Sequence, residues 1–218
     1  RAIIESPDSQ RALATLKRAS AMPFCVFPVR WDDGFSSLFP HLAQFRQGTR
    51  LVCAQAVLKA HDGKLPEALD WLTVSYRMAD QAAAEPTLIA QLVAVAMRAI
   101  SDKAAHQIIA PATLTPAQAR GLYDQLARVQ LAATYEAGMR MELAQGLTSI
   151  EGLRQRRQDL RPLPGELDNP YPGLQAVLYS GLASPLLKLE ETNYARAMRQ
   201  VIARSRQPYR ETAGAPDI

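Results

Sequence analysis

Few residues of this chain have the types and spacings that support chemistry. His61-Asp62 is a dipeptide that binds metal in some phosphohydrolases, but it directly precedes Gly63 and has no further His or Asp ligands at usable spacing. Asp102 and His106 lie one helical turn apart and could share a metal, although a metal site needs more than two ligands. We interpret His61 as a helix-end residue that complements the helix dipole, interpret Asp102 and His106 as an exposed pair, and predict no metal site.

The motifs of the common enzyme classes are absent from the sequence. It contains no Gly-x-Ser-x-Gly, no phosphate-binding loop, no Gly-x-Gly-x-x-Gly and no repeated Glu-x-x-His. No spacing pairs a nucleophile with a base. We predict a protein that is not an enzyme, with no catalytic residues and no cofactor; Glu136 or Glu142 would be the acid to consider in an enzyme.

Cys25 and Cys53 are the only cysteines, and neither belongs to a Cys-x-x-Cys pair. Isolated cysteines of this kind are most often small buried hydrophobic residues. In an oxidising compartment, one bridge between the two remains open.

Arginines form two clusters. Arg154, Arg156, Arg157 and Arg161 precede a loop, and a second run, without an intervening acid, comprises Arg196, Arg199, Arg204, Arg206 and Arg210. A solvated helix face is one interpretation of such a run. The other is docking to an acidic protein or an anionic lipid surface, and we therefore take these five residues as the candidate partner-binding residues.

Composition limits the classes of partner. Residues 1–110 carry 12 basic and 10 acidic side chains and residues 111–218 carry 13 and 11, so the net charge of +4 is spread evenly. Nucleic-acid binding requires clustered basic charge, and we predict no nucleic-acid partner. No signal peptide or transmembrane run is visible, and the sequence opens at Arg1 without a methionine, which leaves open membrane association through a segment upstream of Arg1.

Proline, glycine and capping residues predict the helix ends. Ser6-Pro7-Asp8 starts a helix to about Ala21, the extended segment from Phe24 to Val29 follows, and Asp32-Asp33-Gly34 is a turn. Further helices are expected from Pro40 to His61, from Pro66 to about Ala83, from Thr115 onward and from about Ala132 to Gln158, the last with Gly138 and Gly146 as points of weakness.

The most continuously apolar segment is Leu88–Ile109. Its first half has hardly any polar side, which predicts a helix buried all round at the centre of the core. A Pro/Gly-rich loop at 161–173 precedes one or two last helices that end near Arg206. We therefore predict a single all-α domain over 1–218 with about six to eight helices, arranged as antiparallel helical hairpins in a TPR-like fold or a short α-solenoid.

Gly63-Lys-Leu-Pro-Glu-Ala-Leu resembles the middle of a tetratricopeptide repeat (TPR), over about one hairpin, without a second copy at the period of roughly 34 residues. Over about 38–205 the chain is also similar to uncharacterised helical proteins of planctomycete-like bacteria. The matching pieces are Pro40-His-Leu-Ala-Gln-Phe-Arg-Gln, Gly63 with Glu67-Ala-Leu, Glu85-Pro-Thr-Leu-Ile-Ala-Gln-Leu-Val, and Tyr194 to Ile202. This resemblance implies an upstream membrane anchor and a location in the cell envelope or a periplasm-like compartment; otherwise the protein is cytoplasmic.

Two functions are consistent with these features. The first is a non-enzymatic protein-interaction or scaffold subunit of the bacterial envelope, whose partner is another protein bound by a groove or by the C-terminal arginines. The alternative is a small-ligand or lipid-binding helical domain, with an apolar cavity near Met97, Met139 and Met141.

Overall fold

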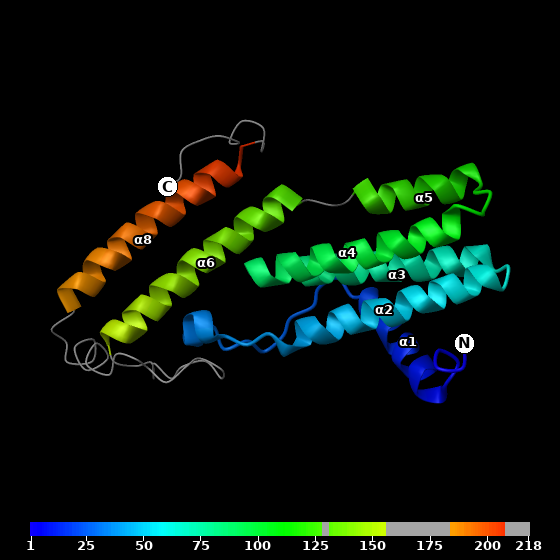
Figure 1. Ribbon diagram of the computed structural model, residues 1–218, viewed down its shortest axis with the longest axis horizontal. Helices are drawn as coiled ribbons and strands as arrows, with labels where there is room; N and C mark the ends of the chain where they lie inside the picture. Colours follow the sequence, from blue (N-terminus) through cyan, green and yellow to red (C-terminus); the bar gives the residue numbers. More distant parts are fainter. Residues whose placement is uncertain (128–130, 156–183, 208–218) are drawn as a thin grey trace. The chain divides into compact units, whose positions relative to one another are not determined.

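The computed structural model describes residues 1–127, 131–155 and 184–207 (Figure 1). Within these ranges the chain forms seven α-helices and one 3-10 helix and no β-strand, which confirms the predicted all-α fold of six to eight helices. None of the described helices combines the length and the apolar character needed to cross a membrane. The predicted loop at 161–173 lies outside the described residues.

Two compact units divide the chain. The first comprises Arg1–Pro28 and Phe39–Gly138, and the second comprises Val29–Leu38 and Met139–Ile218. One helix, α6 (Leu131–Arg154), passes from the first unit into the second. The single domain over 1–218 stays a prediction, because compact units that share a helix need not fold separately.

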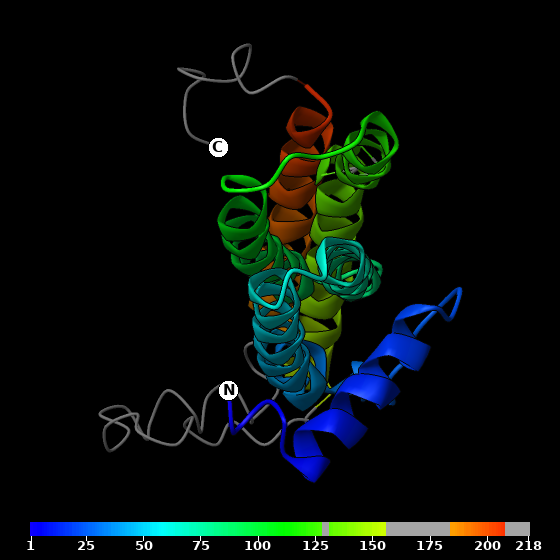
Figure 2. The same ribbon diagram turned by 90° about the vertical axis from the view of Figure 1, so that its right-hand side faces the viewer.

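The first unit contains α1 (Pro7–Ser20), α2 (Pro40–His61), α3 (Leu65–Ala83), α4 (Leu88–Ile109) and α5 (Pro116–Ala127). Their ends follow the local signals in the sequence. The Ser6 hydroxyl accepts a hydrogen bond from the Ser9 amide at 3.3 Å. Gly63, with a φ of 74°, forms the turn between α2 and α3. Figures 1 and 2 show α2, α3 and α4 side by side, and successive helices run in opposite directions.

Small side chains allow α2, α3 and α4 to pack closely. Of the 17 buried residues of α3 and α4, 8 are alanine, and Leu72, Met97 and Ile108 are the largest fully buried side chains of the two helices. Leu13 brings α1 onto the same core beside Val52 of α2. Burial of this apolar surface is the main contribution to the stability of the unit.

Two polar contacts cross the α3–α4 hairpin. The Tyr76 hydroxyl donates to an Asp102 carboxylate oxygen at 2.7 Å, and one turn away Arg98 forms an ion pair with Asp80 at 2.6 Å. A third contact brings in α5, since the Gln125 amide donates to Asp80 at 3.4 Å. These pairs fix the register of α3 against α4.

The prediction that Leu88–Ile109 is buried all round is wrong. The buried side of α4, which faces α2 and α3, carries the small residues Ala90 and Ala94 together with Met97. The larger apolar residues Leu92 and Val95 lie on the opposite side and are 63% and 50% exposed. Close helix packing selects the smaller side chains, so the more hydrophobic face of α4 is left outward.

The second unit contains the 3-10 helix η1 (Trp31–Ser36), the part of α6 from Met139 onward, and α8 (Ser184–Ser205). The predicted turn at Asp32-Asp33-Gly34 lies inside η1 and packs on α6. There the Gln145 amide donates to the Gly34 carbonyl at 3.3 Å, and the Phe35 amide donates to the Ser149 hydroxyl at 3.0 Å. A φ of 56° at Gly34, and an ideal Cβ position only 2.2 Å from the Ser149 oxygen, require glycine there.

Neither Gly138 nor Gly146 interrupts α6. Gly146 lies beneath the Tyr194 ring of α8, where an ideal Cβ would be 2.3 Å from the ring carbons. The Tyr194 hydroxyl donates to the Glu142 carbonyl at 2.8 Å, which fixes α8 on α6. In the first unit, an ideal Cβ at Gly138 would lie 3.3 Å from the Leu88 nitrogen. Both glycines are therefore sites of close packing.

Candidate functional site

Of the C-terminal arginines that the sequence singles out, Arg196, Arg199 and Arg204 lie on α8, and Arg206 directly follows its last residue. Arg196, Arg199 and Arg206 are exposed, and their spacing of three and seven residues places them toward one side of the helix and its end. Arg204 is half-buried and lies off that face. Arg210 lies outside the described residues. The run therefore contributes a set of three exposed guanidinium groups rather than a continuous stripe of five.

A groove between α6 and α8 brings two of these arginines together with a third. Its volume is about 520 Å³, and its apolar floor comes from both helices: Leu143, Ala144 and Leu147 of α6 with Ile202 and Ala203 of α8. Arg140, Arg199 and Arg206 line the same groove. We call these eight residues the arginine groove.

The antiparallel arrangement of α6 and α8 distributes the charge along the groove (Figures 1 and 2). Arg140 and Arg206 lie toward one end, and Arg199 lies toward the end where Leu147 is found. No acidic side chain lines the groove, and Arg199 has no ion-pair or hydrogen-bond partner among the described residues. The groove is thus apolar along its floor and has arginine side chains at both ends.

Sequence reasoning did not find Arg140. The signal was present as Arg140, Leu143, Ala144 and Leu147 at i, i+3, i+4 and i+7, which form one stripe of a helix. Which stripe of α8 it faces depends on the register of two helices that are far apart in sequence.

Of the other arginine cluster, only Arg154 lies among the described residues. Arg154 at the end of α6 is paired with Glu151 of the same helix at 2.6 Å, which holds the pKa of that carboxyl below its usual value. Arg156, Arg157 and Arg161 lie outside the described residues.

The candidate metal residues have other roles. His61 is the last residue of α2, and Asp62 is its C-terminal cap. The Asp62 carboxylate forms an ion pair with Arg1 at 3.1 Å. Asp102 binds the Tyr76 hydroxyl. Across 1–127, 131–155 and 184–207, no three His, Cys, Asp or Glu side chains are placed to hold a metal ion.

Both cysteines are free thiols in the structure. Cys25 belongs to the extended segment that follows α1, where partial burial and then the Glu85 carboxylate raise its pKa. Burial also raises the pKa of Cys53, although hydrogen bonds to Ser75 and Ser101 oppose the shift. Thiols with raised pKa values are poor nucleophiles.

Near Cys25, the sequence missed a nearly buried hydrogen bond between His41 and Glu85. His41 Nε2 lies 2.7 Å from Glu85 Oε2, and both side chains are nearly buried. The Phe27 ring stacks on His41 with 4.1 Å between the ring centroids. This cluster attaches the extended segment to the start of α2. Because the Cys25 thiol stays protonated, we assign the cluster a structural role.

The methionine cavity proposed from the sequence does not match the hollows described here. Met97 is completely buried in the core of the first unit, and Met139 is buried in the second. Neither lines the arginine groove or the hollow of about 590 Å³ between α2, α4 and the N-terminal segment.

The chain matches no known family profile, no curated protein and no solved structure. The likenesses to tetratricopeptide repeats and to the planctomycete-like proteins therefore stay predictions.

Proposed function

We propose that this chain is a non-enzymatic protein-interaction subunit that binds an acidic amphipathic helix of another protein in the arginine groove. The observation that carries the proposal is the combination, in one groove, of an apolar floor and three arginines, with no acid among the described residues that line it. A helix laid in such a groove buries its apolar face and presents its flanking carboxylates to the guanidinium groups.

The dimensions of the groove agree with this occupant. Along α6 the lining residues run from Arg140 to Leu147, a separation of seven residue steps or about 10 Å of helix axis. A partner helix would therefore contact it over about two turns, with apolar residues at i, i+3 and i+4 and acids on either side. Arginine favours this role because its planar guanidinium binds carboxylates with two hydrogen bonds.

The sequence left open whether the arginines meet an acidic protein or an anionic lipid surface. A bilayer surface would engage the exposed arginines of α8 by charge alone, including Arg196, which does not line the groove. Docking of a helix also requires the hollow between α6 and α8. The presence of this hollow favours a protein partner.

Site-specific photocrosslinking in native cells tests the proposal. A photoreactive residue replaces Ala203, which lies in the groove and is exposed, in the full-length protein. The expected result is a crosslink to one protein at a segment with acids flanking an apolar helical stripe. The pair Arg199→Glu and Arg206→Glu should abolish it without loss of helicity by circular dichroism.

Two further variants make the result specific. Arg50→Glu changes the same kind of charge at an exposed position of α2 and should leave the crosslink unchanged. Leu143→Asp keeps all three arginines but places a charge in the apolar floor, and it should remove the crosslink. Crosslinks that survive both groove variants would refute docking of a protein helix. The same conclusion would follow if Arg199→Glu/Arg206→Glu lost only its binding to anionic vesicles.

The TPR-like character and the envelope location are part of the same proposal. The α2–α3 hairpin has Gly63 in its turn and Glu67-Ala-Leu near the start of α3, which supports a TPR-like arrangement for one hairpin. The envelope location rests on the resemblance to planctomycete-like proteins. Fractionation of native cells tests it, because recovery only in the cytoplasmic fraction would contradict it.

A further inference from the structure

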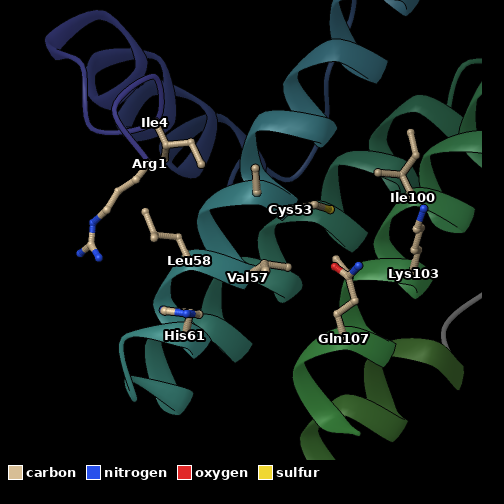
Figure 3. Close-up of a pocket in the computed structure, with 11 residues that line it drawn as sticks. Arg1, Ile4, Cys53, Val57, Leu58, His61, Ile100, Lys103 and Gln107 are labelled. Atoms are coloured by element: carbon tan, nitrogen blue, oxygen red, sulfur yellow. The ribbon is translucent and has the colours of Figure 1, made fainter. Parts of the chain in front are cut away.

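The first unit has a second candidate binding site, in a hollow of about 590 Å³ between α2, α4 and the N-terminal segment (Figure 3). Small-molecule sites typically occupy roughly 300–1,000 Å³. Its residues are separate from those of the arginine groove, and neither the sequence motifs nor the proposed function accounts for it.

Small residues create the hollow. Cys53 of α2 and Ala104 of α4 form its floor and are nearly buried, and Ala54 lies beside them. Cys53 and Ala104 are also members of the core cluster around Leu72, so the floor is the outer side of well-packed core. Ala54 contributes only a methyl group to the lining, so a larger side chain there would project into the hollow.

The walls are aliphatic. Val57 and Leu58 come from α2, Ile100 from α4 and Ile4 from the segment before α1. Figure 3 shows these residues on both sides of the hollow. From Cys53 to His61 the lining extends over eight residue steps, about 12 Å of helix axis. An elongated apolar hollow of this kind suits a single aliphatic chain.

The rim is polar and carries only positive formal charge. Lys103 and Gln107 line it from α4, His61 lines it at the end of α2, and Arg1 lies on the third side. Arg1 is already paired with Glu5 and Asp62, at 2.8 and 3.1 Å. Lys103, by contrast, makes no hydrogen bond or ion pair with the described residues, and no carboxylate lines the hollow.

We infer that this hollow binds a single-chain amphiphile with an anionic head group, whose aliphatic chain lies over Cys53 and Ala104 and whose head group is held by Lys103. His61 and Gln107 offer further hydrogen bonds to the head group, since neither has a partner among the described residues. The head group is a carboxylate or a phosphate, and both are recognised by the same positive rim.

Calorimetric titration of the full chain with dodecanoate, dodecyl phosphate and dodecyltrimethylammonium, each below its critical micelle concentration, tests the inference. The two anions should bind at one site, and the cation should bind at least tenfold more weakly, equivalent to about 1.4 kcal/mol. Tighter binding of dodecanoate assigns a fatty acid, and tighter binding of dodecyl phosphate assigns a lipid phosphate. Equal binding of all three would overturn recognition of the head group.

Variants separate the chain site from the head-group site. Ala54→Leu should abolish binding of both anions, and Lys103→Glu should weaken it about tenfold or more. Lys64→Glu makes the same charge change at an exposed residue outside the hollow and should bind as the wild type does. Arg199→Glu should also have no effect, so that failure of this inference and failure of the arginine groove are distinguishable.

Cys53 provides a readout that locates the ligand. In a Cys25→Ser variant it is the only thiol of the chain, and it lies in the floor of the hollow. Saturating dodecanoate should slow its reaction with a small disulfide reagent at least fivefold, whereas Lys103→Gln, which keeps the helix but removes the charge, should require more dodecanoate for the same protection. Binding without protection of Cys53 would place the ligand elsewhere and overturn the inference.

Discussion

Replacing Gly146 by alanine tests the packing of α8 on α6, on which the arginine groove depends. An ideal Cβ at this position lies 2.3 Å from Cε1, Cζ and Oη of Tyr194, whereas non-bonded carbons pack at about 3.5–4.0 Å. The ring must therefore retreat by more than ~1 Å. Either α8 shifts, or Tyr194 changes rotamer and loses its bond to the Glu142 carbonyl.

Opposing contributions set the expected size of the effect. Alanine is favoured over glycine within a helix by about 1 kcal/mol. Against this, overpacking costs about 1–3 kcal/mol and the hydrogen bond of Tyr194 contributes about 1 kcal/mol. Gly146→Ala should therefore lower the free energy of unfolding by about 1–3 kcal/mol. In a Tyr194→Ala background the same change should raise it by about 1 kcal/mol, because only the helix propensity remains.

The two tryptophans allow the measurement to be made for each unit. Trp31 belongs to the second unit and Trp71 to the first, and the chain has no others. Urea unfolding of Trp71→Phe variants, followed by fluorescence, then reports the surroundings of Trp31. Gly121→Ala is the matched control, because an ideal Cβ at Gly121 meets nothing within 4 Å. A stabilising Gly146→Ala in the presence of Tyr194 would refute the packing described here.

Three further predictions concern the first unit. Burial, followed by the hydrogen bond to Asp102, raises the pKa of Tyr76 well above its usual value of 10.0. The protonated Tyr76 therefore contributes fully to the stability of the fold below about pH 10, and this contribution is lost as the pH rises further. Absorbance titration at 295 nm from about pH 9 to 11 should therefore give the same curve for wild type and Tyr76→Phe; a missing tyrosine step in the variant would contradict the burial. At neutral pH Cys53, which is 5% exposed, should react with thiol reagents much more slowly than the half-buried Cys25, as mass spectrometry of the labelled peptides would show, and the reverse order would be inconsistent with the structure. Gly63→Ala should cost about 1 kcal/mol in thermal or urea unfolding because its φ is 74°, and an unchanged midpoint would mean that the turn has another conformation.

Much of the fold could be predicted because local chemistry determines helix ends. The Ser6 cap, Pro40 and the Gly63 turn each act within a few residues of their position, and the structure places the helix ends where these signals predict them. The Thr115–Gln118 capping box is also present, with the Thr115 amide donating to the Gln118 side chain at 2.9 Å.

The features that sequence reasoning missed depend on which helix faces which. Val95 is apolar, but the smaller Ala94 beside it allows closer packing, so hydrophobicity alone selects the wrong face of α4. Glycine usually weakens a helix, but Gly146 is the position over which the Tyr194 ring packs. Arg140 joins Arg199 only through the register of α6 and α8. No local pattern contains that information.

The two polar contacts of the α3–α4 hairpin also bear on how the chain avoids misfolding. Alanine-rich helix faces are nearly uniform, and sliding by one turn would change their apolar contacts little. An off-register hairpin, with α4 displaced by four residues, would bring Arg98 to Tyr76 and leave Asp80 beside Ala94. That arrangement leaves the Arg98 guanidinium, the more buried member of the native ion pair, without its carboxylate, so the native alignment is selected by the cost of its competitors as much as by its own contacts.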